Sequence, residues 1–390
     1  MHGINLPKTR FCLVIFLVVS TGIACVVGIY LLQRFPGAKS TLRFVSIVHR
    51  HGERSPMSNY PNDPYKGESF WPEGLHVLVQ RGKESMFELG RFLRHRYDGF
   101  LSEIYRPSEL LVISSDLDRC IMSANLVLAG LYPPVKFQNW NPELSWQPVP
   151  VHTLPDDCDD MIQFTKRCDL YSEEKTKADA FIQMSLDEEK EMLDYFSRAT
   201  GRNLTTNVDV TQLYDNLLIV ELHGMPLPEW AQGANLGRLK NFFDRDCILY
   251  FLTPEMIHLR SGVMLNEMLV NMKRKIDARI NLERRLNLYS VHDTTIASIW
   301  QGMNISREIK EQPQFGAALI LELHEIRSEY YVKILYKESS AVETLAVLKT
   351  GGCEEDQPSE EDGMCAFSTF SAALEPATIA DFEKACRITS

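Results

Sequence analysis

The stretch TLRFVSIVHRHGERSP, residues 41–56, decides the fold. Its first part, residues 41–49, is apolar with few interruptions, which is typical of a short strand buried on both faces of a parallel sheet. The strand is expected to end at Arg50-His51-Gly52. Because parallel sheets bind ligands beyond the carboxyl ends of their strands, we expect a functional site at residues 50–56.

Short apolar runs and amphipathic segments alternate through much of the remaining chain. Helical spacing of apolar residues predicts helices at 83–97, 121–131 and 256–270, and a further helix opens after His292-Asp293. The apolar runs that predict strands are 110–113, 286–291, 318–323 and 330–336. Strands that alternate with covering helices predict an α/β fold, a three-layer α/β/α sandwich with a mostly parallel sheet.

The middle of the chain has a different character. Residues 141–249 consist of proline-rich loops and strongly charged amphipathic stretches, which indicate a smaller, mainly helical insertion domain. The flanking segments 40–140 and 250–390 would together form the α/β catalytic domain. No fixed repeat or low-complexity tract interrupts this pattern.

The N-terminus has the features of a targeting segment. A basic segment, residues 1–10, precedes an apolar segment at 11–33, and Phe11 to Leu32 carries no charge. This run exceeds the 7–15 apolar residues typical of a signal-peptide core and reaches the roughly 20 that cross a bilayer. We predict a signal anchor with a lumenal or extracellular catalytic domain. A cleaved signal peptide, giving a secreted or lysosomal protein, is the alternative.

The composition argues against nucleic acid as a partner and against a zinc site. With 45% hydrophobic residues the chain can form a large core, and its formal net charge of −11 argues against binding nucleic acid. The nine cysteines lack the spacing of a zinc site, so disulfides and buried thiols are the better interpretation. Asn203 and Asn304 each begin a glycosylation triplet, which fits a secretory address.

The chemistry of residues 50–56 points to an anion. Arg50 and Arg54 flank His51, and Gly52 lets the backbone approach a ligand closely. Guanidinium groups at a buried strand end must be paired or hydrogen-bonded, and a phosphate would satisfy both. The alternative is that residues 50–56 form a solvated surface loop with charged side chains, beside a histidine that only packs. That interpretation would suit a lone histidine, and the extended motif argues against it.

Two motifs resemble the signatures of the histidine acid phosphatases. Arg50-His51-Gly52-x-Arg54-x-Pro56 is similar to the nucleophile signature of that family, and His292-Asp293-Thr294-Thr295 is similar to its second signature. The resemblance extends through Asp116-Leu117-Asp118-Arg119 and Trp140-Asn141-Pro142 toward the prostatic, lysosomal and insect venom branches. It implies a phosphoglycerate-mutase-like fold and a phosphoric monoester hydrolase that needs no metal or cofactor.

The resemblance also implies a role for each site residue. His51 would attack phosphorus and form a covalent phosphohistidine, and Asp293 would protonate the leaving alcohol. The residues that would hold the phosphoryl oxygens are Arg50, Arg54, Arg119 and His292. The substrate would be a small phosphomonoester or a phosphoprotein, with broad specificity, and the family suggests a homodimer. A phytase-like or other narrow-specificity phosphatase, and an inactive relative acting as a binding module, are the alternatives.

The chain departs from the family at one position near the predicted site. Ile113 stands where the prostatic and lysosomal branches have an arginine, which would remove an orienting charge. The resemblance pairs Cys168 with Cys386 and Cys353 with Cys365. It leaves open the state of Cys120, Cys158 and Cys247. His49, two residues before His51, is interpreted as a packing residue.

Overall fold

The structure is a computed structural model that describes residues 40–155, 159–162, 168–249, 251–280, 282–305, 312–353 and 363–386. The apolar segment predicted at 11–33 and Cys158 lie outside these residues, as does the side chain of Cys247. Among the residues that are described, no helix has both the length and the apolarity needed to cross a membrane.

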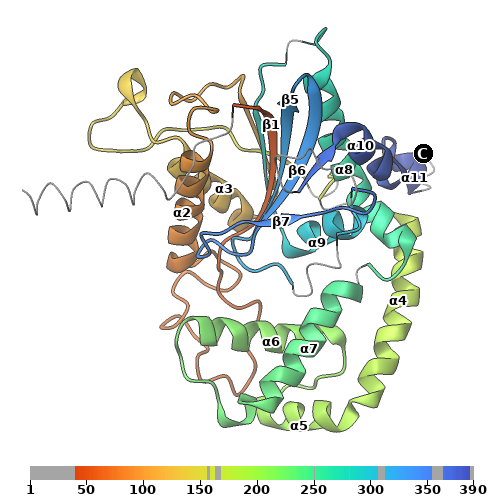
Figure 1. Ribbon diagram of the computed structural model, residues 1–390. Coiled ribbons are helices and arrows are strands. Elements are labelled where there is room, and N and C mark those ends of the chain that lie inside the picture. Colours follow the sequence, from red (N-terminus) through yellow and green to blue (C-terminus); the bar gives the residue numbers. More distant parts are fainter. Residues whose placement is uncertain are drawn as a thin grey trace, which may run out of the picture.

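The core of the molecule is an eight-stranded sheet with the order β3-β2-β4-β1-β5-β6-β7, in which β8 pairs with β6 (Figure 1). Strands β3, β2, β4 and β1 run parallel, whereas β5 to β8 add by antiparallel pairing. The strands are β1 (Leu42–Arg50), β2 (Leu110–Ser115), β3 (His152–Leu154), β4 (Leu286–Val291), β5 (Ala318–Ile326), β6 (Glu329–Lys337), β7 (Ala346–Leu348) and β8 (Met364–Ala366).

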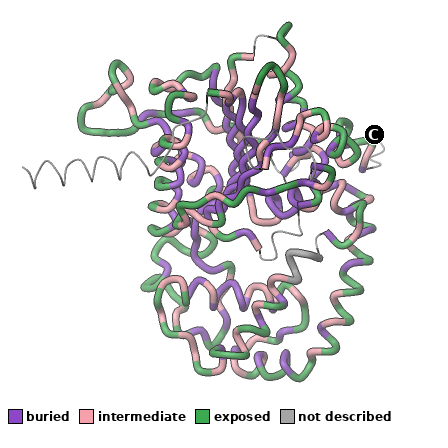
Figure 2. Tube along the Cα trace, in the orientation of Figure 1, coloured by how far each residue is buried: buried purple, intermediate pink, exposed green. Residues whose placement is uncertain are grey.

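Helices cover both faces of this sheet, so the predicted three-layer α/β/α architecture is confirmed (Figures 1 and 2). Along β1, Val45 and Ile47 pack toward one helical layer and Phe44 and Val48 toward the other, because successive side chains alternate across a strand. The first layer is α2 (Gln80–Arg96) and α3 (Asp118–Leu131). The second is α8 (Pro254–Ile276), α9 (Asp293–Gly302) and α10 (Phe367–Leu374).

Four helices lie beyond the carboxyl ends of the parallel strands, at the bottom of Figure 1. They are α4 (Asp169–Glu188), α5 (Lys190–Thr200), α6 (Asn207–Leu222) and α7 (Ala234–Leu249). Their contacts form a separate hydrophobic cluster that includes Phe196, Val210, Leu217 and Leu239. We propose that they constitute the smaller helical domain.

We propose that the helical domain begins after residue 154 rather than at residue 141, where the sequence places its start. Strand β3 lies at His152–Leu154 and pairs in parallel with β2, so this part of the predicted insertion belongs to the main sheet. The remaining short elements are η1 (Lys136–Gln138), η3 (Glu229–Ala231), η4 (Glu375–Ala377) and α11 (Phe382–Ala385).

Two disulfides involve cysteines of the C-terminal segment. Cys168, at the start of α4, is bonded to Cys386, 218 residues later, and Cys353 is bonded to Cys365. These are the two pairs that the family resemblance implies. Cys120 is a free thiol buried in α3.

Candidate active site

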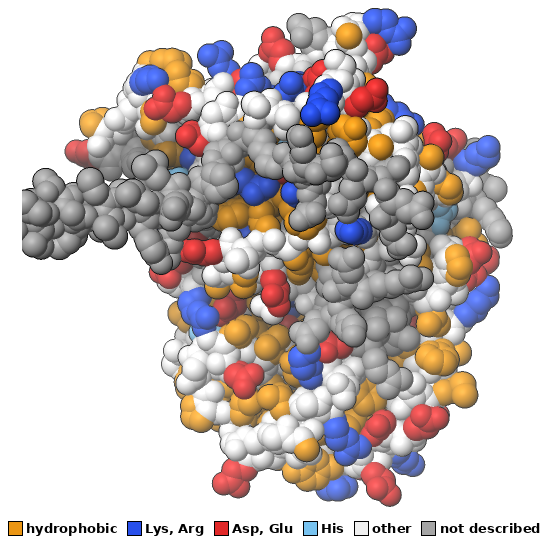
Figure 3. Space-filling view, viewed as in Figure 1, with side chains coloured by type: hydrophobic (Ala, Val, Ile, Leu, Met, Phe, Trp, Pro, Cys, Tyr) orange, Lys and Arg blue, Asp and Glu red, His pale blue; other side chains and the backbone are white. Residues whose placement is uncertain are grey.

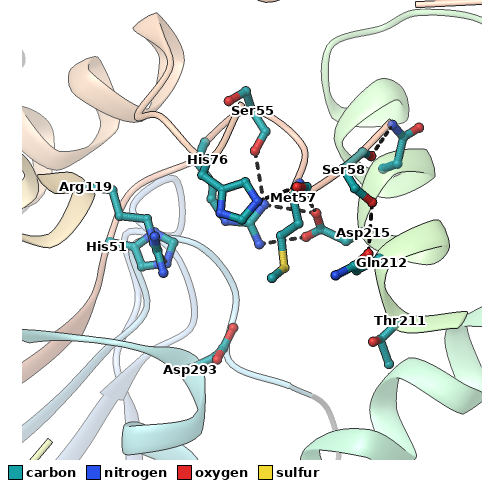
Figure 4. A network of polar contacts seen from close by, with 12 residues as sticks. His51, Ser55, Met57, Ser58, His76, Arg119, Thr211, Gln212, Asp215 and Asp293 are labelled. Carbon is teal, nitrogen blue, oxygen red and sulfur yellow. Dashed lines mark hydrogen bonds and ion pairs between the residues drawn. The ribbon is translucent and has the colours of Figure 1, made fainter. Parts of the chain in front are cut away.

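The register of the sheet brings the two sequence signatures together. β1 pairs with β4 from Val45↔Leu286 to Arg50↔Val291, so both strands end at the same level and His51 and His292 follow directly. Their rings lie 5.6 Å apart, centroid to centroid. Figure 4 shows His51 beside Arg119, with Asp293 below them and Asp215 reaching in from α6.

The His51 ring is held in one tautomer by its two hydrogen bonds. Its Nδ1 lies 2.8 Å from the carbonyl oxygen of Gly52, which can only accept, so Nδ1 carries the proton. Arg119 Nε donates to His51 Nε2 over 3.2 Å, so Nε2 presents a lone pair. His51 is therefore a neutral ring with the lone pair of Nε2 turned toward a guanidinium group.

Burial keeps the His51 ring neutral at acidic pH. Only 2% of the residue is exposed, and this burial, followed by the positive charges of Arg50, His292, Arg119 and Arg54, lowers the pKa of His51 well below 6.5. The ring of His51 would thus remain unprotonated under conditions in which an exposed histidine is charged.

Close packing fixes the loop that carries His51. A Cβ atom on Gly52 would lie 2.7 Å from the carbonyl oxygen of Gly82 in α2, so only glycine fits. The Gly52 amide also donates to Ser123 Oγ of α3 over 3.0 Å. Both helices of one layer therefore position His51.

Two buried arginines lie near the ring of Phe315, with their guanidinium carbons 4.0 Å and 5.7 Å from its centre. The Arg50 guanidinium stacks 4.0 Å from the centre of this ring and donates to the carbonyl oxygen of Pro313 over 2.6 Å. Its other terminal nitrogen lies 2.6 Å from an Asp293 carboxylate oxygen. Arg54 binds both carboxylate oxygens of Asp215, a fully buried residue of α6, over 3.0 and 2.8 Å.

His292 and Asp293 begin α9. His292 Nε2 lies 3.0 Å from Ser115 Oγ, and burial, followed by the charge of Arg119, lowers the pKa of His292 to about 4. Burial opposes ionisation of Asp293, but the charge of Arg50 and the Thr294 amide outweigh it, so the pKa of Asp293 is lower than its ordinary value. Asp293 is a carboxylate when no substrate is bound.

The structure brings the catalytic candidates and the phosphate-binding candidates into one site. Three arginines gather there, and two of them are paired with Asp293 and Asp215. On the face drawn in Figure 3, by contrast, the described Lys and Arg side chains are dispersed among Asp and Glu. No group of three or more His, Cys, Asp and Glu side chains in the described part of the chain could hold a metal ion.

Sequence reasoning missed Asp215 and Phe315. Neither lies in a recognisable motif, and each reaches the site only through the folding of a distant segment. Ile113 is partly buried and packs against the core on the α8 and α9 side. His49 is fully buried and its Nδ1 donates to the backbone of Arg50, as a packing residue would.

Cys120 lies directly behind the second signature. Its Sγ is 3.8 Å from His292 Nε2, and burial raises the pKa of the thiol to about 12. It is therefore an uncharged packing group at the base of the site. The predicted glycosylation sites Asn203 and Asn304 are both exposed.

Comparison with known proteins identifies the family. Residues 41–337 match the model of the histidine phosphatase superfamily, branch 2. The lysosomal acid phosphatase of Xenopus laevis is 33% identical over 377 residues, which are 95% of this chain and 84% of that protein. The prostatic acid phosphatase of Bos taurus is 33% identical over 354 residues, covering 89% of this chain and 88% of the relative.

Solved structures share the fold at lower identity. The phytase from Citrobacter braakii superposes with a TM-score of 0.66 at 17% identity, covering 90% of this chain and all of that one. An apo form of the Hafnia alvei phytase gives a TM-score of 0.64, also at 17% identity, over 89% of this chain and 98% of the phytase.

Proposed function

This chain belongs to the histidine phosphatase superfamily, branch 2, and from its site we propose that it hydrolyses phosphate monoesters through a covalent phosphohistidine at His51. The family and its acid phosphatase relatives make it a phosphoric monoester hydrolase. The observation that supports the route is the tautomer of His51, whose Nδ1 proton is engaged by Gly52 while Nε2 keeps its lone pair.

Phosphate would bind among the three arginines. Arg119 Nε donates to Nε2 of His51 in the free protein. If a phosphoryl oxygen accepts this hydrogen bond instead, phosphorus lies close to Nε2. Asp215 and the Ser55 carbonyl occupy three of the five N–H groups of Arg54, which leaves two for the substrate. Guanidinium groups in a dry site stabilise the charge on the equatorial oxygens in the transition state.

The proton for the leaving group would reach it through Asp293. The carboxyl is ionised in the free enzyme, but a phosphate monoester has a second pKa of about 6, so below that pH the substrate brings a proton with it. The negative charge of the phosphoryl group beside Arg50 would also raise the pKa of Asp293. Asp293 would then donate the proton to the leaving oxygen as the P–O bond breaks.

The reaction would proceed in two displacements. In the first, the Nε2–P bond forms and the alcohol leaves with the proton from Asp293. In the second, water attacks phosphorus, the P–N bond breaks, and Asp293 takes the proton of the water. The phosphate then takes the proton from Asp293 and leaves as the monoanion, so the products are the alcohol and inorganic phosphate and Asp293 is again a carboxylate.

We also propose that the protein enters the secretory pathway. Its two disulfides and the exposed Asn203 support this route, because disulfides persist in oxidising compartments. Anchoring or cleavage at 11–33, glycosylation, and a lysosomal or secreted destination are part of the proposal. A shift in gel mobility after enzymatic removal of N-glycans, lost in Asn203→Gln/Asn304→Gln, would support it. Unchanged mobility would contradict glycosylation.

A homodimer is proposed as well. The loop at 137–146 exposes the large apolar side chains of Phe137, Trp140, Leu144 and Trp146, which a second copy could cover. Light scattering should give twice the mass of one chain for the wild type and one chain for Trp140→Glu. A monomeric wild type at micromolar concentration would contradict the dimer.

The phosphatase proposal is tested by activity. The chain from residue 40 onward, expressed by a secretory route, should hydrolyse p-nitrophenyl phosphate with an acidic optimum, and His51→Ala should lose turnover while remaining folded. His152→Ala, which removes an exposed histidine of the edge strand β3, is the matched control. A folded wild type that binds phosphate without turning over any phosphomonoester would favour the inactive binding relative. Faster turnover of phytate than of simple monoesters would favour the phytase.

A further inference from the structure

A cavity of about 400 Å³ adjoins the candidate active site. Arg50 and Phe315 belong to both, and the guanidinium group of Arg50 lies 2.6 Å from Asp293. A phosphoryl group held by Arg50 would therefore have its ester oxygen close to the mouth of this cavity. Ligand pockets typically have volumes of about 300–1,000 Å³, so the space suffices for a small organic group.

One wall of the cavity is an apolar row on α6. Tyr214, Leu218 and Leu222 are spaced four residues apart and so lie on one face of the helix, and Phe243 of α7 lines the cavity beside them. Tyr214 is buried in the hydrophobic cluster of the helical domain, and Leu218 packs against the edge of that cluster. Leu218 and Leu222 remain half-exposed toward the cavity, where they bury less apolar surface than they could.

Four charged groups of the cavity are paired within it. Lys240 lies 2.6 Å from Asp244, and Arg81 lies 3.8 Å from Glu53. Both carboxylates line the same cavity as these two cations, so these four charges balance. The third cation of the lining, Arg50, is paired with Asp293 outside the cavity. A second phosphate would be repelled by Asp244 and Glu53 as much as it would be attracted by their partners. The lining therefore favours an uncharged, apolar group over a polyphosphorylated one.

We infer that this cavity is a leaving-group site, so that the enzyme prefers phosphate monoesters of apolar alcohols such as medium-chain alkyl phosphates. The inference rests on the proposed function, since it names the group that departs when phosphate is transferred to His51. The phosphate binds among the arginines, and the apolar chain lies along the row formed by Tyr214, Leu218 and Leu222.

Ethyl and octyl phosphate test the inference, because their leaving alcohols have similar intrinsic reactivity and differ in apolar length. If about half of the transfer free energy of the six additional methylene groups is realised, kcat/KM for octyl phosphate exceeds that for ethyl phosphate about 50-fold. The measurement is made below the concentration at which octyl phosphate forms micelles. Phytate is included as a polyphosphorylated competitor.

Variants of the apolar row on α6 show whether this row is the origin of the preference for octyl phosphate. Leu218→Gln/Leu222→Gln should lower the octyl-to-ethyl ratio about tenfold, because glutamine keeps the helix propensity and makes the wall polar. Val208→Gln is the matched control: Val208 is a 55% exposed apolar residue of the same helix that does not line this cavity, so the ratio should stay at the wild-type value.

The outcomes separate the inference from the proposed function. A wild-type ratio near one, an unchanged ratio in the double variant, or faster turnover of phytate than of octyl phosphate would overturn the leaving-group site while leaving the phosphatase intact. No turnover of ethyl or octyl phosphate by the folded wild type would overturn the proposed function itself, and the inference with it.

Discussion

Asp215→Asn perturbs the site without replacing a residue of either sequence signature. Asp215 accepts two hydrogen bonds from Arg54 and one, over 2.9 Å, from the amide of Met57. It is 2% exposed, and Arg54 is 6% exposed. Asparagine keeps the shape but presents an NH₂ group to one Arg54 donor, so one of the two guanidinium contacts becomes repulsive.

The loss of this buried pair has two measurable consequences. Breaking a buried ion pair by removing one partner costs about 3–5 kcal/mol, and we expect the free energy of unfolding to fall by about 3 kcal/mol because the amide retains one contact. A guanidinium group displaced by about 1 Å costs up to about 100-fold in rate. We therefore expect kcat/KM for p-nitrophenyl phosphate to fall about 10- to 100-fold, together with weaker competitive inhibition by inorganic phosphate.

Glu221→Gln is the control for this experiment. It removes the same charge from the same helix at an exposed position and should change neither stability nor kinetics appreciably. Thermal unfolding and steady-state kinetics are measured on both variants. If Asp215→Asn retains the phosphate inhibition constant and the turnover of Glu221→Gln, the carboxylate of Asp215 does not position Arg54.

Three further predictions follow from single contacts. Asp293→Asn should lower kcat about 10²–10⁴-fold, and more for ethyl phosphate than for p-nitrophenyl phosphate, whose leaving group needs no proton; equal losses for both substrates would contradict the proton donor. Burial lowers the pKa of His49 to about 4. Between about pH 6.5 and 4 the unfolded chain therefore binds a proton that the folded chain does not. The free energy of unfolding consequently decreases as the pH is lowered through this range. His49→Leu should weaken this fall by about 3 kcal/mol in urea unfolding curves, and parallel pH profiles would contradict it. Cys168→Ser/Cys386→Ser should lower stability by about 2–5 kcal/mol and reduce the further loss that a reductant causes, since only Cys353–Cys365 is left to reduce; an unchanged melting temperature would show that the Cys168–Cys386 disulfide contributes nothing.

The parallel part of the fold could be predicted because its signal is local. The long strands are nearly continuous apolar runs, and the covering helices repeat apolar residues at helical spacing. His51 and His292 could be expected at one edge of the sheet because both follow such strands. The three-residue strands β3, β7 and β8 could not be predicted, because their pairing depends on neighbouring strands rather than on their own pattern.

The supporting residues of the site depend on tertiary packing. Asp215 lies 161 residues from Arg54 along the chain, and an aspartate within a helix gives no signal that it faces a buried arginine. The apolar row of Tyr214, Leu218 and Leu222 looks like an ordinary core face in the sequence. Only the placement of α6 beyond the sheet shows that this row lines a cavity.

The covalent intermediate is the central claim, and trapping it is the most direct test. Asp293→Asn, mixed with p-nitrophenyl phosphate and quenched under alkaline denaturing conditions that preserve phosphohistidine, should gain one phosphoryl group on the peptide that contains His51. A burst of p-nitrophenol equal to the enzyme concentration should accompany it, and Asp293→Asn/His51→Ala should show neither. A label on another residue, or a burst that survives the loss of His51, would contradict the mechanism.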